Sequence, residues 1–304
     1  MKNIELINSK IKEIEKRYNV QVIFAVDGGS NAYGYASPDS DIDLRFLYVE
    51  TIESYLRLNR EKDVIEIIDQ NNDIEYKGFS LDKFMKLLSK SNPSNLEWLN
   101  SPIIYFENTK YENIIKAIKE LAVDYFSSKR CLFHYTGNAI TDLKKLESTV
   151  KYNYDNSELL VGVGVKKLLS VYRELLICEY IVSKGSFPKT TDLKELIDFS
   201  EEVKELRDDK GRSFLEFLLF SLNFKKVQKK SELKELVMEK DFYDKHIEFF
   251  NKTINEYRNK AEKLKDKAID FDKINSLYIW WVKEINSWKH QWKELENENL
   301  CWKE

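Results

Sequence analysis

The chain has 304 residues, of which 42% are hydrophobic, and it contains 17 Phe, 17 Tyr and 6 Trp. This length and apolar content can supply two domains, each with a core of its own. A formal net charge of −3 excludes the strongly basic proteins that coat nucleic acids, and only three histidines argue against a zinc or histidine-relay enzyme. No apolar stretch approaches the ~20 residues that cross a bilayer. The N-terminal residues are polar and helical in period, unlike a signal peptide, so we expect a cytoplasmic protein without a membrane segment.

The hydrophobic period of the chain changes near residue 107. Before it, helices are expected at 4–18, 81–89 and 92–99, and strands at 22–27, 41–49, 63–68, 73–78 and 102–106. After it, only helices are expected, at 111–126, 135–146, 159–183, 192–199, 213–222, 242–267 and 274–297. The pattern predicts an α+β fold, with a mixed domain over 1–106 followed by an all-α domain over 107–304.

A turn rich in glycine follows the strand predicted at 22–27. Because Gly28 and Gly29 have no side chains, backbone N–H groups at this turn can approach an anion closely, and Ser30 adds a hydroxyl donor. The sequence therefore predicts a phosphate-binding turn at this point.

Two aspartates, Asp41 and Asp43, lie one residue apart at the start of the next predicted strand. Alternation along the strand places both carboxylates and Arg45 on one face, while the intervening apolar residues enter the core. Neighbouring carboxylates repel each other unless a cation lies between them, and hard oxygen ligands suit magnesium. We therefore expect a metal site beside the phosphate site.

This combination of a strand, a Gly-Ser turn and a strand with Asp-x-Asp resembles the nucleotidyltransferase superfamily of DNA polymerase β. More narrowly, residues 29–46 are similar to a bacterial and phage family of predicted nucleotidyltransferases associated with RNA repair. Residues 90–103 resemble a second signature of that family, and Lys167 with Tyr172 and Arg173 resembles a third. The resemblance implies a mixed sheet with flanking helices, closed by a helical domain that contacts the acceptor.

The chemistry of this superfamily also needs a third carboxylate from a neighbouring strand. Glu75, in the strand predicted at 73–78, matches the acidic position of the family best. Asp73 is the alternative, because it is expected on the same strand face two residues earlier.

The resemblance implies catalytic and metal-binding roles for Asp41, Asp43 and Glu75. These residues would bind two Mg²⁺ ions, with Mn²⁺ as a possible substitute, while the acceptor oxygen attacks the α-phosphorus of an NTP, with ATP as the expected substrate. Gly29 and Ser30 would hold the phosphates.

Three basic residues are expected to assist at the nucleotide. Arg45 would neutralise phosphate charge, or alternatively form a salt bridge that orients one aspartate. Lys166, Lys167 and Arg173 fall at i, i+1 and i+7 of one predicted helix. The resemblance assigns Lys167 and Arg173 to the triphosphate, and the alternative is that they are surface charges.

The leading functional hypothesis is addition of a nucleoside monophosphate to an RNA or tRNA 3′ end, with release of pyrophosphate. The alternatives are adenylylation of a protein hydroxyl, as in antitoxin-type nucleotidyltransferases, and a nucleotide-binding regulator without turnover.

Two further patterns leave their roles open. The basic run 225–230 could meet RNA phosphates or form a solvated loop. The helical stripe of Trp281, Ile285, Trp288 and Trp292 is more typical of a core or a dimer contact than of base stacking.

Overall fold

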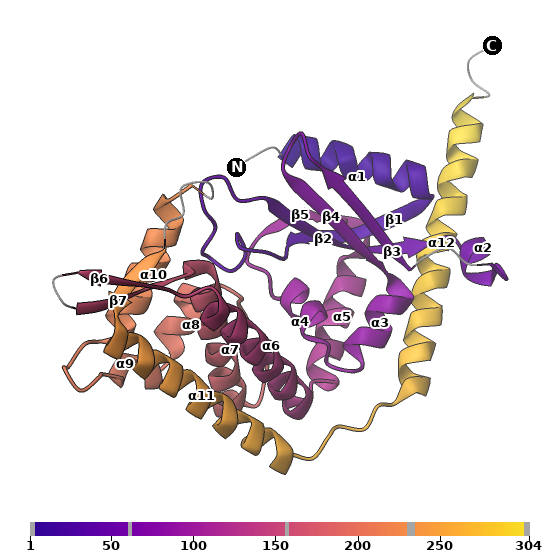
Figure 1. The fold of residues 1–304 in the computed structure, drawn as a ribbon. Coiled ribbons are helices and arrows are strands. Elements are labelled where there is room, and N and C mark those ends of the chain that lie inside the picture. The colour runs from indigo at the N-terminus through magenta and orange to yellow at the C-terminus, as the bar shows by residue number, and fades with distance from the viewer. Residues whose placement is uncertain (1–3, 60–62, 156–157, 230–234, 301–304) are drawn as a thin grey trace.

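The computed structural model describes residues 4–59, 63–155, 158–229 and 235–300 (Figure 1). Its main sheet has five strands in the order β3-β4-β2-β1-β5. The β2–β4 pair is parallel, and the other three pairings are antiparallel. The strands are β1 (Val20–Asp27), β2 (Ile42–Glu50), β3 (Val64–Asp69), β4 (Ile74–Ser80) and β5 (Ile104–Glu107).

Helices cover both faces of this sheet (Figure 1). On one face, Leu44 and Phe46 of β2 pack with the apolar stripe of α1 (Ile4–Tyr18), which includes Ile7, Ile11 and Ile14. The remaining helices are α2 (Ile52–Leu56), α3 (Leu81–Leu88), α4 (Pro93–Leu99), the 3₁₀ turn η1 (Thr109–Tyr111), α5 (Glu112–Asp124), α6 (Ser128–Ser148), α7 (Val165–Lys184), α8 (Leu193–Phe199), α9 (Glu202–Glu205), α10 (Phe214–Val227), α11 (Lys240–Lys263) and α12 (Phe271–Leu300).

The other face of the sheet belongs to a larger core that continues through the rest of the chain. Leu47 and Val49 of β2 share this core with α3, α4 and α5, and with residues as distant as Leu169 of α7 and Phe250 of α11. Because one core crosses residue 107, the change of period there marks a change of secondary structure and not a gap in packing.

The α+β fold class is confirmed, but the second part of the chain is not exclusively helical. A small antiparallel sheet in the order β6-β7-β8 consists of β6 (Lys151–Asp155), β7 (Glu158–Val163) and β8 (Leu236–Glu239). The helix predicted at 159–183 therefore begins only at Val165. The reason is local: Val161 and Val163 alternate with glycines, and β-branched residues with glycine favour a strand over a helix.

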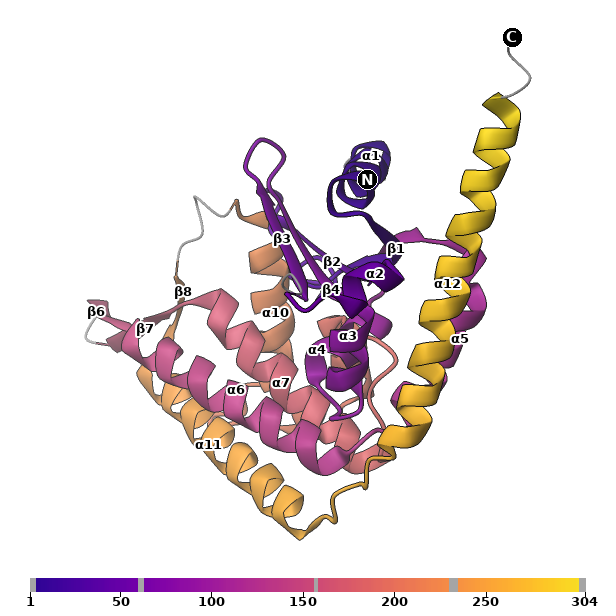
Figure 2. The same ribbon diagram turned by 90° about the vertical axis from the view of Figure 1, so that its right-hand side faces the viewer.

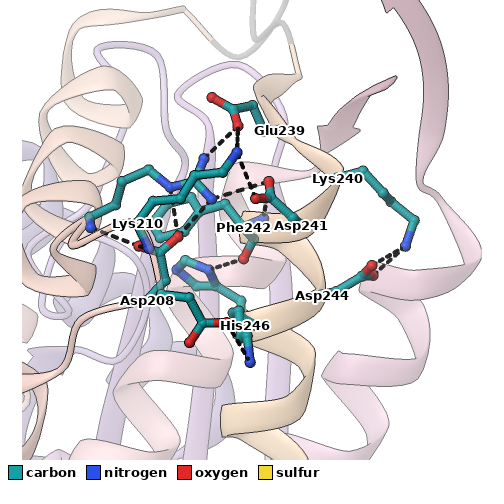
Figure 3. A network of polar contacts seen from close by, with 11 residues as sticks. Asp208, Lys210, Glu239, Lys240, Asp241, Phe242, Asp244 and His246 are labelled. Carbon is teal, nitrogen blue, oxygen red and sulfur yellow. Dashed lines mark hydrogen bonds and ion pairs between the residues drawn. The ribbon is translucent and has the colours of Figure 1, made fainter. Parts of the chain in front are cut away.

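A network of ion pairs joins the segment before α10 to β8 and the start of α11 (Figure 3). Lys210 contacts Glu239 and Asp241, both at 2.8 Å. Arg212 contacts Asp208 at 2.6 Å, Glu239 at 2.8 Å and Asp241 at 3.1 Å. Two cations and three carboxylates thus fix this segment against α11.

Below this network, His246 of α11 is almost completely buried among aromatic rings. Its ring stacks on Phe214 with centroids 4.0 Å apart, and Phe217 and Phe242 surround it. Nδ1 lies 2.8 Å from the carbonyl of Phe242, so it carries the proton and donates, whereas Nε2 has no partner among the described residues (Figure 3). Burial lowers the pKa of His246 to about 4.

The last helix, α12, returns to the N-terminal sheet and lies beside α2 and α3 (Figure 2). Trp281 and Ile285 are fully buried there, which confirms the core interpretation for these two members of the tryptophan stripe. The side chains of Trp288 and Trp292 lie outside the described residues. Asn286 anchors the helix, because its Oδ1 accepts from the N–H of Ile52 and its Nδ2 donates to the carbonyl of Glu50.

The cysteines agree with the expectation of buried thiols where they are described. Cys131 and Cys178 are both free and buried, and Cys301 lies outside the described residues. Within the described part of the chain, no helix combines the length and the apolar character needed to span a bilayer.

Candidate active site

The strand register brings the two predicted acidic motifs to one edge of the sheet. β2 and β4 run in parallel, with Asp43 directly beside Glu75. β1 is antiparallel to β2, so its C-terminal end meets their N-terminal ends, and the N–H of Gly28 donates to the carbonyl of Asp43 at 2.8 Å. The glycine turn and the carboxylates are therefore neighbours, as their spacing predicts.

Asp41 and Asp73 precede their strands. Ile42 pairs with Ile74, and the N–H of Ile42 donates to the carbonyl of Asp73 at 2.8 Å. Asp73 has a φ of +53° and belongs to the turn before β4, so the expectation that it shares the strand face of Glu75 is wrong. This geometry favours Glu75 as the third carboxylate, while Asp41 stands exposed at the mouth of the site.

Arg45 lies between the two paired carboxylates. Its two terminal nitrogens contact Glu75 Oε1 at 2.8 Å and Asp43 Oδ1 at 2.7 Å. The sequence left open whether Arg45 neutralises phosphate charge or forms a salt bridge that orients one aspartate. The structure has this salt bridge, and Arg45 forms a second one with Glu75. Burial raises the pKa of Asp43, and the charge of Arg45 opposes that rise.

The carboxylates do not form a preassembled metal site. Among the described residues, no group of three or more His, Cys, Asp or Glu side chains is arranged to hold a metal ion. The guanidinium of Arg45 donates to both Asp43 and Glu75. Carboxylate oxygens are the ligand type that suits Mg²⁺, so the chemistry of Asp43 and Glu75 fits this ion.

Both positions of the turn require glycine, because the side chains of Asp43 and Arg45 approach the backbone closely there. A Cβ added at Gly29 would lie 1.9 Å from Asp43 Oδ2, and one at Gly28 would lie 2.4 Å from Cγ of Arg45. No side chain fits at either position without displacing the carboxylate or the guanidinium. The turn can therefore present its backbone directly beside Asp43.

Asp27, the last residue of β1, braces this turn and was missed by the sequence analysis. It is fully buried, and its Oδ1 accepts from the N–H groups of Gly29 at 2.9 Å and Ala32 at 3.3 Å. Its Oδ2 accepts from the hydroxyl of Tyr105 at 2.9 Å. The N–H of Gly29 is thus already used inside the protein, whereas the Ser30 hydroxyl makes no hydrogen bond to any described side chain or backbone group. The feature of the sequence that could have identified Asp27 is its position directly before two glycines.

Arg173 lies in the interior and not in an open cleft. Its guanidinium pairs with Glu97 at 2.9 Å and stacks on the ring of Tyr33, 3.8 Å from the ring centre. Glu97 also accepts from the hydroxyls of Tyr33 at 2.9 Å and Tyr135 at 2.8 Å. Burial alone would raise the pKa of Glu97, but Arg173 and these hydrogen bonds hold it below its usual value. The geometry gives Arg173 a bracing position behind the turn.

The two lysines at the start of α7 point in different directions. Lys167 pairs with Asp142 of α6 at 2.8 Å. Lys166 is exposed, and its charge acts on the carboxyl of Asp43, where it favours the ionised form. Successive helix positions differ by 100°, so only one of two adjacent lysines can face the carboxylates. Lys166 is therefore a cation of the helical part whose charge acts on the site.

The helical part also holds the loop between the glycine turn and Asp41. Thr191 donates to the carbonyl of Ala32 at 3.2 Å. Lys225 of α10 is buried, and its ammonium contacts the hydroxyl of Ser37. The expectation of a solvated basic loop at 225–230 is therefore wrong for Lys225, because α10 extends to Val227 and packs it against this loop. Lys230 lies outside the described residues.

Comparison with known proteins identifies the family of this chain. The sequence pattern of the RNA repair pathway DNA polymerase beta family matches residues 4–280. The chain belongs to this family. It is a nucleotidyltransferase of the DNA polymerase β superfamily, as the motifs at 29–46 predict.

Two known proteins are similar to the chain to different degrees. The uncharacterized protein YcgL of Bacillus subtilis (strain 168) is 30% identical over 288 residues, which cover 93% of this chain and 97% of YcgL. A nucleotidyltransferase-like protein from Exiguobacterium sibiricum, known from a crystal structure, is 16% identical, with coverage of 72% of this chain and 74% of that protein and a TM-score of 0.29.

Proposed function

We propose that the chain is a Mg²⁺-dependent enzyme that transfers a nucleoside monophosphate from an NTP to the 3′ hydroxyl of an RNA or tRNA, with release of pyrophosphate. The observation that carries the proposal is the register of Asp43 beside Glu75, directly against the glycine turn. A carboxylate pair next to a glycine turn that carries the Ser30 hydroxyl suits phosphoryl transfer.

Asp41, Asp43 and Glu75 would hold the Mg²⁺ ions, with Mn²⁺ as a substitute. When bound, the metal would withdraw charge from the triphosphate and lower the pKa of the acceptor hydroxyl. Arg45 would leave the carboxylates and pair with a phosphate oxygen, for which its planar, two-pronged guanidinium is well suited.

Other side chains would bind and orient the nucleotide. The Ser30 hydroxyl would donate to a phosphate oxygen, and Lys166 would neutralise triphosphate charge from the helical part. We do not place Lys167 and Arg173 at the triphosphate, because each is paired inside the protein. Arg173 instead would hold Tyr33, and with it the glycine turn, in position. Residues 1–106 would thus supply the chemistry, and residues 107–304 would cover the nucleotide and contact the acceptor.

A labelling experiment tests this proposal. The protein is incubated with Mg²⁺, α-labelled NTPs, total tRNA and cell lysate, in parallel with Asp43→Asn and with Asp69→Asn as a matched control on the edge strand β3. We expect label in RNA for the wild type and the control, and none for Asp43→Asn. Label in protein would replace the RNA acceptor by a protein hydroxyl, and no label in any sample would contradict transferase activity.

A further inference from the structure

A second concave site lies at the end of α4. It is a cavity of about 650 Å³ between the end of α4, α5 and the end of α7. This volume is within the range of sites that bind small molecules. The residues that give it its chemistry are Asn100, Lys119, Phe126, Tyr180, Phe187 and Lys189.

Three aromatic side chains, Phe126, Tyr180 and Phe187, are among the residues that line this cavity, and two of these rings are held by neighbours. The ring of Phe187 stacks near that of Tyr135 with centroids 6.3 Å apart, and the ring of Tyr180 lies 4.6 Å from that of Phe199. Flat surfaces fixed in this way suit a flat aromatic ligand.

The charge at the rim of the cavity is positive. Lys119 and Lys189 are exposed, and neither forms an ion pair with any described residue. No carboxylate is among the residues that line the cavity. Asn100 uses its amide N–H to donate to the carbonyl of Leu96 at 2.8 Å, and its amide oxygen remains an acceptor for an N–H donor. The ligand that fits is a planar aromatic group that has an N–H donor and carries a negative charge.

The cavity lies close to the carboxylate site without sharing residues with it. The Ser101 hydroxyl, at its wall, donates to the carbonyl of Asp27 at 2.7 Å, and the N–H of Asp27 donates to Ile103 at 3.0 Å. In the sheet, β5 adjoins β1 and β1 adjoins β2, so this wall is about two strand spacings, roughly 10 Å, from Asp43. A short piece of a single nucleic-acid strand spans that distance.

We propose that this cavity binds a nucleotide unit, with the base between the aromatic walls and the phosphate at Lys119 and Lys189. The unit comes either from a free mononucleotide or from an RNA strand. Binding of a nucleotide in this cavity does not depend on the proposed transfer reaction. Only the alternative in which the nucleotide belongs to an RNA strand rests on that proposed function.

The experiment measures binding to the full-length protein in the presence of EDTA, so that the carboxylates hold no metal-bound triphosphate. The probes are AMP, adenosine, inorganic phosphate and a five-residue oligoadenylate RNA, titrated by calorimetry. We expect AMP to bind at least tenfold more tightly than adenosine or phosphate. Lys119→Glu should weaken AMP binding at least tenfold, whereas Lys116→Glu, which makes the same change on α5 outside the cavity, should alter it less than twofold.

The RNA probe distinguishes the two sources. Binding of the oligonucleotide at least tenfold more tightly than AMP supports an RNA unit, and equal or weaker binding supports a free mononucleotide. Absence of binding by both AMP and the oligonucleotide, or equal effects of Lys119→Glu and Lys116→Glu, would overturn the proposal. Asp43→Asn should lose transfer but keep AMP binding, so failure of the transfer reaction and failure of the pocket are separate results.

Discussion

Replacement of Arg45 by Gln tests whether its guanidinium holds the place of a metal ion. Arg45 is 14% exposed, and the carboxylates that it joins, Asp43 and Glu75, are 29% and 46% exposed. A partly buried contact to a charged group contributes roughly 1.5–3 kcal/mol, and a more exposed pair roughly 0.2–1 kcal/mol. Loss of both contacts leaves two carboxylates side by side. We therefore expect Arg45→Gln to lower the free energy of unfolding by about 2–4 kcal/mol without metal.

The assay is urea unfolding in EDTA and in excess Mg²⁺. Because the variant exposes both carboxylates to the ion, Mg²⁺ should stabilise it more than the wild type, and the affinity for Mg²⁺ should rise by about tenfold, or about 1.4 kcal/mol. Lys77→Gln is the control, because it removes a more exposed ion pair, with Glu66, on the same sheet. A loss no larger than that of Lys77→Gln, or an unchanged affinity for Mg²⁺, would refute the idea that Arg45 competes with the ion.

Three further predictions concern the same site and the buried histidine. Glu75→Gln should reduce transfer far more than Asp73→Asn, and the reverse order in a transfer assay would show that Asp73 is the metal ligand. Gly29→Ala should reduce transfer at least a hundredfold while circular dichroism shows an intact fold, because its Cβ would displace the carboxylate of Asp43. Burial lowers the pKa of His246 to about 4, so the unfolded chain binds this proton more readily between about pH 6.5 and pH 4. The free energy of unfolding should fall across that window as the pH falls, by roughly 3 kcal/mol in all. His246→Phe should lessen this slope in urea titrations, and an unchanged slope would assign the pH dependence to other groups.

Local patterns predict the strands and the motif residues of this site well. A continuous apolar run identifies β1, period-2 alternation identifies β2, and the residue types from Gly29 to Asp43 indicate metal and phosphate chemistry. None of these patterns predicts that β2 pairs with β4, because the register of the two strands is set by contacts between segments about 30 residues apart. The sequence therefore leaves open whether Glu75 or Asp73 reaches Asp43, and whether Arg45 also contacts the third carboxylate.

The same limit applies to Arg173. A basic residue in a helix has the same local signature whether it faces a ligand or a buried acid, and its partner Glu97 is 76 residues away. The small sheet was missed for a related reason, because β8 pairs with β7 only after a long excursion of the chain. Lys166 and Lys167 are adjacent in sequence, so only the orientation of α7 about its own axis decides which of the two lysines lies nearer to Asp43.

The return of α12 to the first sheet has a consequence for synthesis of the protein on the ribosome. Asn286 anchors this helix to the carbonyl of Glu50, which is 236 residues earlier in the chain. All the residues of the carboxylate site have left the ribosome long before Trp281 appears, yet the surface that this side chain covers stays open to water until then. The nascent enzyme therefore exposes an apolar patch to water during most of its translation. Products of premature termination before α12 would expose that patch permanently, which makes them targets for chaperones and proteases.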